Sequence, residues 1–224
     1  GARGQDDALR PLHAGAALPP EGTVAVLRRA QFVSNGPPPT VESAEFPGAR
    51  VPRQFGELDL AVSRAELLLV CGAIGSGKST LLAALANAAP LRAGHRALTL
   101  SRAYCAQRPF LLRGSVRANI TFGKLPFAPS RYAEALRLAA LDLDLRQLSH
   151  GDQSECGEGG CNLSDGQRAR VAFARAIYAD ADFLILDDVF AAVDAGTATL
   201  LWSSLETLLR REKAIVLATH QLQL

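Results

Sequence analysis

The chain has 224 residues, and 24 Lys and Arg against 22 Asp and Glu leave a formal net charge of only +2. A charge this close to zero creates no field that would attract a polyanion, so nucleic acid is not an expected partner. A hydrophobic content of 48% excludes disorder as the main state and suffices for one sizeable core, or for a core with a small subdomain. No apolar run approaches the roughly 20 residues that span a bilayer, so we expect no direct membrane insertion of this chain.

The N-terminal part is expected to be a linker followed by two strands. Residues 1–20 are rich in Gly, Ala, Pro and Arg and predict a linker, which leaves residues 21–224 as the folded domain. Apolar side chains predict a strand over residues 23–32, and alternation over residues 55–62 predicts a half-buried antiparallel strand. The prolines of residues 34–53 lack N–H donors, so this segment is expected to be a loop insertion. Because the chain starts at Gly1 and has no Met, we expect a piece of a longer polypeptide whose membrane segments could lie outside it.

Buried strands alternate with helices in the remainder of the chain. The continuous apolar run 67–71 is typical of a strand covered on both faces, and two more buried strands are expected at 183–186 and 214–218. Helices are expected over residues 81–89, 131–140, 165–179 and 197–211. This alternation predicts an α/β fold with a mainly parallel sheet, whose chemistry lies at the carboxyl ends of the strands.

The segment after the strand at 67–71 has the pattern G-x-x-x-x-G-K-[ST] of a phosphate-binding loop. Its glycines let backbone N–H groups turn inward around phosphates, and the next helix adds the positive end of its dipole. We expect Lys78 to reach the β- and γ-phosphates and the Ser79 hydroxyl to bind Mg²⁺. The expected nucleotide-binding residues of this segment are Gly72, Ala73, Ile74, Gly75, Ser76, Gly77, Lys78, Ser79 and Thr80.

Two acidic residues follow the strand at 183–186. Asp187 closes the strand and is the expected carboxylate ligand of Mg²⁺. Asp188 is then placed to polarise an attacking water as a general base, which makes it a candidate catalytic residue.

Residues 162–176 resemble the signature sequence of ATP-binding-cassette (ABC) proteins, which is usually L-S-G-G-Q and here is Leu163-Ser164-Asp165-Gly166-Gln167. In that family the signature does not contact its own ATP. The resemblance implies that Ser164, Gly166 and Gln167 close over ATP held by the phosphate loop of a second nucleotide-binding domain, so that two domains enclose two nucleotides.

Three further segments resemble motifs of the same family, in the family's order. Residues 104–107 resemble the Q-loop, which implies that Gln107 is a catalytic residue that senses Mg²⁺ and the attacking water and contacts the transmembrane domains. Residues 191–194 resemble the D-loop, which implies that Asp194 reaches across the dimer. Thr219-His220 resembles the switch histidine, which implies a hydrogen bond from His220 to the γ-phosphate.

Residues 110–123 and 157–160 look like subfamily C, the multidrug-resistance-associated and cystic-fibrosis-conductance-regulator branch, and in particular its first nucleotide-binding domain. The resemblance implies a P-loop NTPase core, an N-terminal antiparallel β subdomain and a helical signature subdomain over about residues 108–179. It implies ATP and Mg²⁺ as cofactors, and a place at the cytoplasmic face of a membrane within an integral membrane transporter. A full cassette domain would continue beyond Leu224, so we expect a C-terminal truncation.

The sequence departs from the family pattern at three positions. Asp188 stands where hydrolysing cassettes carry Glu, so a regulatory site that binds ATP without hydrolysing it stays open as an alternative. Asp165 replaces a Gly and brings a negative charge beside a phosphate site. Ser34 falls near an aromatic that stacks on adenine, so either Phe32 takes over the stacking or the stacking is lost.

Two other classes of cassette protein fit less well. Gly160 follows Gly77 by 83 positions without sustained heptads, whereas DNA-repair and chromosome cassettes place a long coiled coil there. Soluble translation-factor cassettes normally carry two cassettes and basic arms for RNA, and this sequence shows neither.

Overall fold

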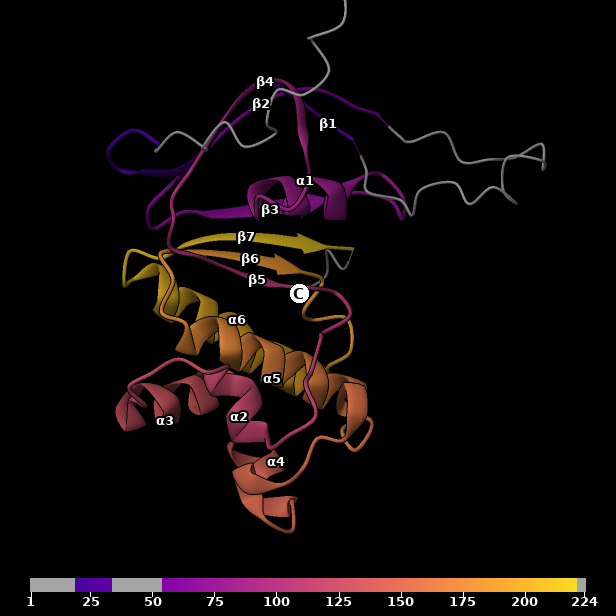
Figure 1. Cartoon of the computed structure of the whole chain (residues 1–224), viewed down its shortest axis with the longest axis vertical. Helices are drawn as coiled ribbons and strands as arrows, with labels where there is room; N and C mark the ends of the chain where they lie inside the picture. The colour runs from indigo at the N-terminus through magenta and orange to yellow at the C-terminus, as the bar shows by residue number, and fades with distance from the viewer. Residues whose placement is uncertain (1–18, 34–53, 221–224) are drawn as a thin grey trace, which may run out of the picture.

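The computed structural model describes residues 19–33 and 54–220 (Figure 1). The predicted linker up to residue 18, the predicted loop insertion 34–53 and residues 221–224 lie outside this part. An antiparallel sheet lies at one end of the molecule, a parallel sheet lies in the middle, and most of the helices lie below the parallel sheet (Figure 1).

The antiparallel sheet has the strand order β2-β1-β4. The strands β1 (Thr23–Val33) and β2 (Gln54–Ser63) lie within one residue of the predicted ranges. The third strand, β4 (Leu91–Leu98), was not predicted, because its exposed middle residues interrupt the apolar pattern. Gly94 in β4 has a φ of 85°, and a Cβ there would lie 2.1 Å from the carbonyl oxygen of Arg29 in β1. Only glycine permits this close pairing of the two strands.

The parallel sheet has the strand order β3-β7-β6-β5, with β3 (Leu67–Cys71), β5 (Arg102–Cys105), β6 (Phe183–Asp187) and β7 (Ala214–Thr219). All three neighbouring pairs are parallel. The predicted mainly parallel α/β sheet is therefore present, together with the antiparallel β subdomain.

One prediction about this sheet is wrong. The apolar run of β3 was expected to be covered on both faces, yet Leu69 is 47% exposed. Among the strands of residues 19–33 and 54–220, β3 lies at the end of the strand order and pairs with β7 alone. The central strands β6 and β7 are instead the ones buried along their whole length.

Side chains of β6 alternate between two separate cores. Phe183 and Ile185 pack with α1 (Lys78–Leu85) and the antiparallel sheet. Leu184 and Leu186 pack with the helices on the opposite face. This alternation follows from the two-residue period of a strand and anchors β6 between the two layers.

The remaining helices cover the lower face of the parallel sheet (Figure 1). The helices α3 (Pro129–Leu138), α5 (Asp165–Tyr178) and α6 (Ala195–Leu209) lie within two residues of their predicted bounds. The predicted helix 81–89 corresponds to α1, which begins earlier because Gly77 caps it in the left-handed conformation and ends earlier, before a turn at Asn87 with a φ of 64°. The short helices α2 (Val116–Thr121) and α4 (Asp142–Gln147) and the 3₁₀ turns Gly151–Gln153 and Glu158–Gly160 were not predicted.

None of the helices in the described ranges combines the length and the apolar character that a membrane crossing requires.

Candidate functional site

Four parallel strands bring distant segments of the chain to one edge of the sheet. β3 leads into the predicted phosphate loop, and β5 ends two residues before Gln107. β6 ends at Asp187, and β7 ends one residue before His220. The carboxyl edge of an open parallel sheet is where ligands bind in α/β folds.

The loop between β3 and α1 surrounds the ammonium group of Lys78. Lys78 Nζ donates to the carbonyl oxygens of Gly72 at 2.6 Å and Ala73 at 3.0 Å. Gly75 and Gly77 have φ values of 80° and 102°, which glycine adopts without strain. The loop therefore closes around one positive charge at the start of α1.

The other predicted residues of this segment belong to the same turn. Ile74 is 96% exposed at the outside of the loop. Ser76 donates its backbone N–H to Ala73 at 3.2 Å, and Ser79 and Thr80 lie in the first turn of α1. The Ser79 hydroxyl is hydrogen-bonded to Asp187.

Asp187 is a buried carboxylate at the end of β6, with 4% of its surface exposed. Burial raises its pKa, and the Asp188 carboxylate raises it further, whereas hydrogen bonds from Ser79 and Tyr104 and the charge of Lys78 lower it. The Tyr104 hydroxyl donates to Asp187 Oδ2 at 3.3 Å. A carboxylate whose charge is poorly solvated is stabilised by a cation placed beside it.

Of the three predicted catalytic residues, Gln107 and His220 each contact Asp188. Gln107 Nε2 donates to Asp188 Oδ2 at 3.3 Å. His220 Nδ1 lies 3.0 Å from Asp188 Oδ1 and 2.8 Å from Oδ2. Asp188 is 8% exposed and adopts a φ of 52°, and its N–H donates to Ala218 in β7 at 2.9 Å. The fold thus brings together three side chains, each of which follows the end of a different strand: Gln107 after β5, Asp188 after β6 and His220 after β7.

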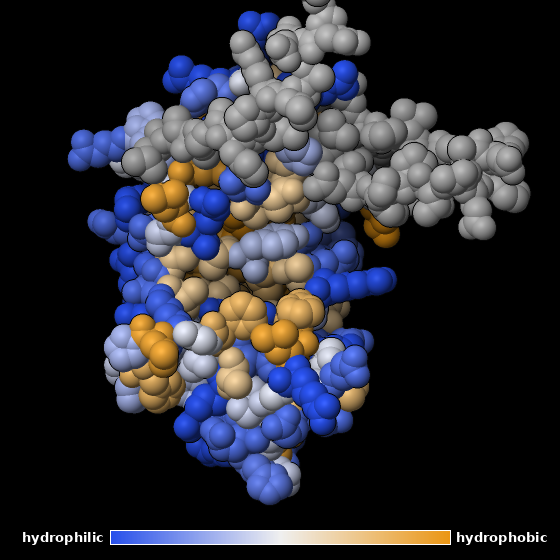
Figure 2. Space-filling view, in the orientation of Figure 1, coloured by the Kyte–Doolittle hydropathy of each residue, from blue (hydrophilic) through white to orange (hydrophobic). Residues whose placement is uncertain are grey.

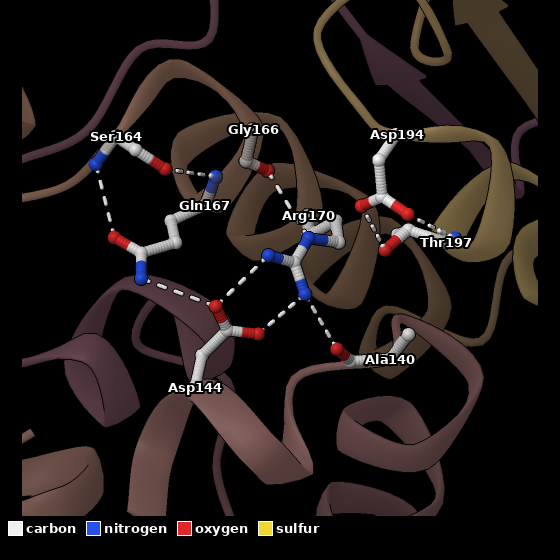
Figure 3. Close-up of polar contacts among 8 residues, drawn as sticks. All are labelled: Ala140, Asp144, Ser164, Gly166, Gln167, Arg170, Asp194 and Thr197. Atoms are coloured by element: carbon white, nitrogen blue, oxygen red, sulfur yellow. Dashed lines mark hydrogen bonds and ion pairs between the residues drawn. The ribbon is translucent and has the colours of Figure 1, made fainter. Parts of the chain in front are cut away.

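The predicted signature forms the N-terminus of α5. Ser164 Oγ accepts the N–H of Gln167 at 3.2 Å, and Gln167 Oε1 accepts the N–H of Ser164 at 2.9 Å (Figure 3). This capping box satisfies one helical donor, and the carbonyl of Ser164 accepts the N–H of Arg168. Helix geometry provides no intrahelical partner for the N–H groups of Asp165 and Gly166, which makes them donors for an anion.

Asp165 and Gly166 in this signature each have a local explanation. Asp165, whose side chain is 78% exposed, forms an ion pair with Arg168, so its negative charge is balanced. A Cβ on Gly166 would lie 2.6 Å from the carbonyl oxygen of Ala192. Gly166 is therefore required because the backbone of the predicted D-loop packs directly against it.

Asp194, at the end of that D-loop, caps α6. Its Oδ1 accepts the N–H of Thr197 at 3.0 Å and its Oδ2 accepts the Thr197 hydroxyl at 2.7 Å (Figure 3). These hydrogen bonds hold the pKa of Asp194 below its ordinary value. Both carboxylate oxygens thus have a partner within the chain.

The residues at the sheet edge fit a nucleotide and its magnesium ion. An inward-turned glycine loop, an ammonium group and a helix N-terminus are donors suited to phosphate. Within residues 19–33 and 54–220, no three His, Cys, Asp or Glu side chains form a metal-binding group of their own. The Ser79 hydroxyl and the Asp187 carboxylate, which are hydrogen-bonded to each other, are oxygen donors of the kind that would hold Mg²⁺.

Comparison with known proteins identifies the family. Residues 55–191, more than half of the chain, match the family described as ABC transporter. The chain belongs to the ABC transporter family. It is 43% identical over 154 residues to ABC transporter C family member 3 of Arabidopsis thaliana. The aligned residues make up 69% of this chain and 10% of that protein.

Two further relatives extend the match. ABC transporter C family member 6 of Arabidopsis thaliana is 37% identical over 85% of this chain and 13% of its own length. ABC-type transporter cicA of Emericella nidulans is 40% identical over 87% of this chain and 14% of its own length. The predicted resemblance to subfamily C of the ABC transporters is therefore confirmed, and the chain spans about a tenth of the length of these relatives.

One prediction about the nucleotide site of this ABC domain is wrong. Phe32 was a candidate for stacking on adenine, but it is 0% exposed in the core between the antiparallel sheet and α1. Arg96 covers its ring, with the guanidinium carbon 5.7 Å from the ring centroid. Ser34, the other position considered, lies outside the described residues.

The sequence analysis missed three residues that support these motifs. Tyr104 donates a hydrogen bond to Asp187, and only its position inside the Q-loop segment could have indicated a role at the site. Asp144 and Arg170 form an ion pair beneath the ABC signature (Figure 3). Asp144 lies on α4, a helix that the sequence pattern does not predict, so nothing marked it.

Proposed function

We propose that this chain is the first nucleotide-binding domain of a subfamily C exporter. We place the domain within residues 21–224, with its helical subdomain at about residues 108–179. The domain binds Mg-ATP and, by ATP-driven dimerisation with a second nucleotide-binding domain, powers or gates transport across a membrane. The observation that carries this proposal is the convergence of the Lys78 loop, Asp187 and the Gln107–Asp188–His220 cluster at one sheet edge.

Each residue at this edge has a role in the proposal. The loop amides and Lys78 hold the phosphates, and Ser79, Asp187 and Gln107 would hold Mg²⁺, which would supply charge neutralisation during phosphoryl transfer. Asp188 takes a proton from the attacking water while the water oxygen bonds to the γ-phosphorus and the bond to the β-phosphate oxygen breaks, so that ADP and phosphate leave. His220 binds the γ-phosphate, and its contact with Asp188 fixes the positions of both side chains.

The second nucleotide-binding domain completes the site. Ser164, Gly166 and Gln167 close over ATP held by the partner domain's phosphate loop. Asp194, at the end of the predicted D-loop, reaches across the dimer. The donors at the N-terminus of α5 and the tight packing of Gly166 on Ala192 support this assignment.

The transmembrane domains dock beside the Q-loop, which places the chain at the cytoplasmic face of the membrane. Apolar side chains gather over the helices below the sheet (Figure 2). Exposed examples that follow Gln107 in the sequence are Phe110 at 66%, Leu112 at 46%, Phe122 at 51% and Leu125 at 84%. An exposed apolar surface of this kind is typical of a protein interface, and we infer no nucleic-acid partner.

Substitution of Lys78 tests the nucleotide site. Lys78→Ala should abolish binding of labelled ATP, because it removes the ammonium group that the carbonyl oxygens of Gly72 and Ala73 hold in the loop. Lys124→Ala removes a lysine whose ammonium bonds the carbonyl of Ala179, in the helical layer, and should bind ATP normally. Normal ATP affinity of Lys78→Ala would refute the proposed site.

A regulatory ATP site without hydrolysis is the second candidate, and the geometry of Asp188 favours it. Asp is one methylene shorter than Glu, and a general base misplaced by about 1 Å loses on the order of 100-fold in rate. Both of its oxygens already have partners in Gln107 and His220. Asp188→Glu in the whole transporter should raise ATP turnover strongly if the site is degenerate, and an unchanged turnover argues against this candidate.

A further inference from the structure

The side-chain amide of Gln167 is bound at both ends. Its Oε1 accepts the N–H of Ser164 at 2.9 Å, and its Nε2 donates to Asp144 Oδ1 at 3.1 Å (Figure 3). The first bond closes the capping box of α5, and the second crosses to α4. Only one orientation of the amide satisfies both bonds.

Asp144 fixes that orientation because its carboxylate can only accept hydrogen bonds. Its side chain is 16% exposed, and that of its ion-pair partner Arg170 is 12% exposed. Arg170 Nη2 donates to Asp144 Oδ1 at 2.9 Å, and Nη1 donates to Oδ2. The carboxylate therefore receives three N–H groups, and the Gln167 amide can face it only with its nitrogen.

Arg170 extends this network to the backbone around the signature. Its Nε donates to the carbonyl oxygen of Gly166 at 3.3 Å, and its Nη1 donates to that of Ala140 at 2.5 Å (Figure 3). Asp144 is thus connected to the first turn of α5 by two routes, through the Gln167 amide and through the Arg170 guanidinium. Ser164 Oγ, which accepts from Gln167 N–H, keeps its own proton to donate elsewhere.

We infer that Asp144 is a positioning residue for the signature, acting through Gln167 and Arg170. The inference rests on the proposed function, because it concerns the contact that the signature makes with ATP of the partner domain. Without the carboxylate, the Gln167 amide keeps only its bond to the N–H of Ser164, and Arg170 becomes a largely buried cation without its counter-charge. The first turn of α5 then meets the partner's ATP in an altered geometry, although none of its own residues has changed.

The test measures ATP turnover of the whole transporter together with ATP binding and thermal stability. Since a misplacement of about 1 Å costs on the order of 100-fold in rate, Asp144→Asn should lower turnover by roughly 10- to 100-fold. ATP bound by this chain's own phosphate loop should be unchanged, because that loop lies at the sheet edge. Asp144→Glu, which restores the charge, should recover part of the turnover. The double variant Asp144→Asn with Gln167→Ala should lose no more than the worse single variant, since the two residues act as one unit.

Asp152→Asn is the matched control, because Asp152 also lies in the helical layer and pairs with an arginine. Its side chain is 17% exposed and lies 2.8 Å from Arg117 Nε. This variant should lower the thermal midpoint as Asp144→Asn does, but leave turnover unchanged. The inference is overturned if Asp144→Asn behaves like Asp152→Asn.

A third variant separates this inference from the proposed function. Ser164→Ala removes the signature hydroxyl and should lower turnover if the signature contacts ATP. A loss in Ser164→Ala without a loss in Asp144→Asn overturns only the role of Asp144. Normal turnover in both variants overturns the proposed signature contact and the inference with it.

Discussion

Substitution of Gly166 by alanine is predicted to separate the signature from the D-loop. The added Cβ would lie 2.6 Å from the carbonyl oxygen of Ala192, whereas ordinary contacts begin at 3.4 Å. The two backbones must therefore move apart by about 0.8 Å. Neither side can yield easily, because Gly166 lies in the first turn of α5 and the Ala192 segment leads directly into the cap of α6.

Two effects of opposite sign set the size of this change. Overpacking costs about 1–3 kcal/mol, while Ala is more favourable than Gly inside a helix by about 0.5–1 kcal/mol. The midpoints of the two ranges differ by about 1 kcal/mol, so the net expectation is a destabilisation of that size, concentrated where the two segments meet. A local loss of this size corresponds to amide exchange that is roughly 5-fold faster.

Hydrogen exchange over residues 191–194, together with thermal unfolding, measures this effect. Gly56→Ala is the control, because a Cβ on Gly56 would meet no atom within 4 Å. The control should leave exchange at residues 191–194 unchanged. If Gly166→Ala gives the same exchange rates as the control, the two segments are not packed as described and the steric reason for glycine is refuted.

Three further predictions concern stability. Phe183→Ala should lower the free energy of unfolding by about 3–5 kcal/mol in denaturant titrations, because Phe183 is fully buried, whereas Leu200→Ala at a 59% exposed position should have little effect. Arg175→Lys keeps the charge but loses the forked guanidinium, which donates to Phe110 O and Asn119 O, each at 2.7 Å. The free energy of unfolding should fall by about 1.5–3 kcal/mol, and full retention of stability would contradict this prediction. Burial alone would raise the pKa of Asp152, but hydrogen bonds from Arg117 and two neighbouring side chains hold it below its ordinary value. The stability that this carboxylate contributes is therefore present above about pH 4 and lost as the pH falls through the lower folded pKa. Asp152→Asn should reduce the loss of stability that the protein shows on acidification below about pH 4. An unchanged loss of stability at acid pH would contradict this prediction.

Local sequence signals predicted most of the secondary structure correctly. The strands β6 and β7 and the helices α3, α5 and α6 carry continuous or periodic apolar patterns, and their bounds differ from the predictions by two residues or fewer. Strands β4 and β5 and helices α2 and α4 escaped prediction. Their patterns are short or interrupted, and they are stabilised by pairing and packing with elements far away in the chain.

Whether a side chain is buried depended on the tertiary structure in two instructive cases. The apolar run of β3 predicted burial on both faces, but its place at the end of the strand order leaves Leu69 partly exposed. Phe32 was a candidate for adenine stacking, but packing of the antiparallel sheet on α1 encloses it completely. A single strand does not reveal which elements will cover it.

The sequence by itself determined the local motifs of this protein: a glycine loop around Lys78, acids at the end of β6, and the predicted signature at the start of a helix. Each of these depends on residues close together in the chain, so a local pattern is enough to find it. Only the tertiary structure decided that Gln107 and His220 both contact Asp188, and that Asp144 bonds the Gln167 amide from a separate helix. These contacts join residues that lie 23 to 81 positions apart, and parallel strand order and helix packing, which bring such residues together, leave no mark in a local pattern.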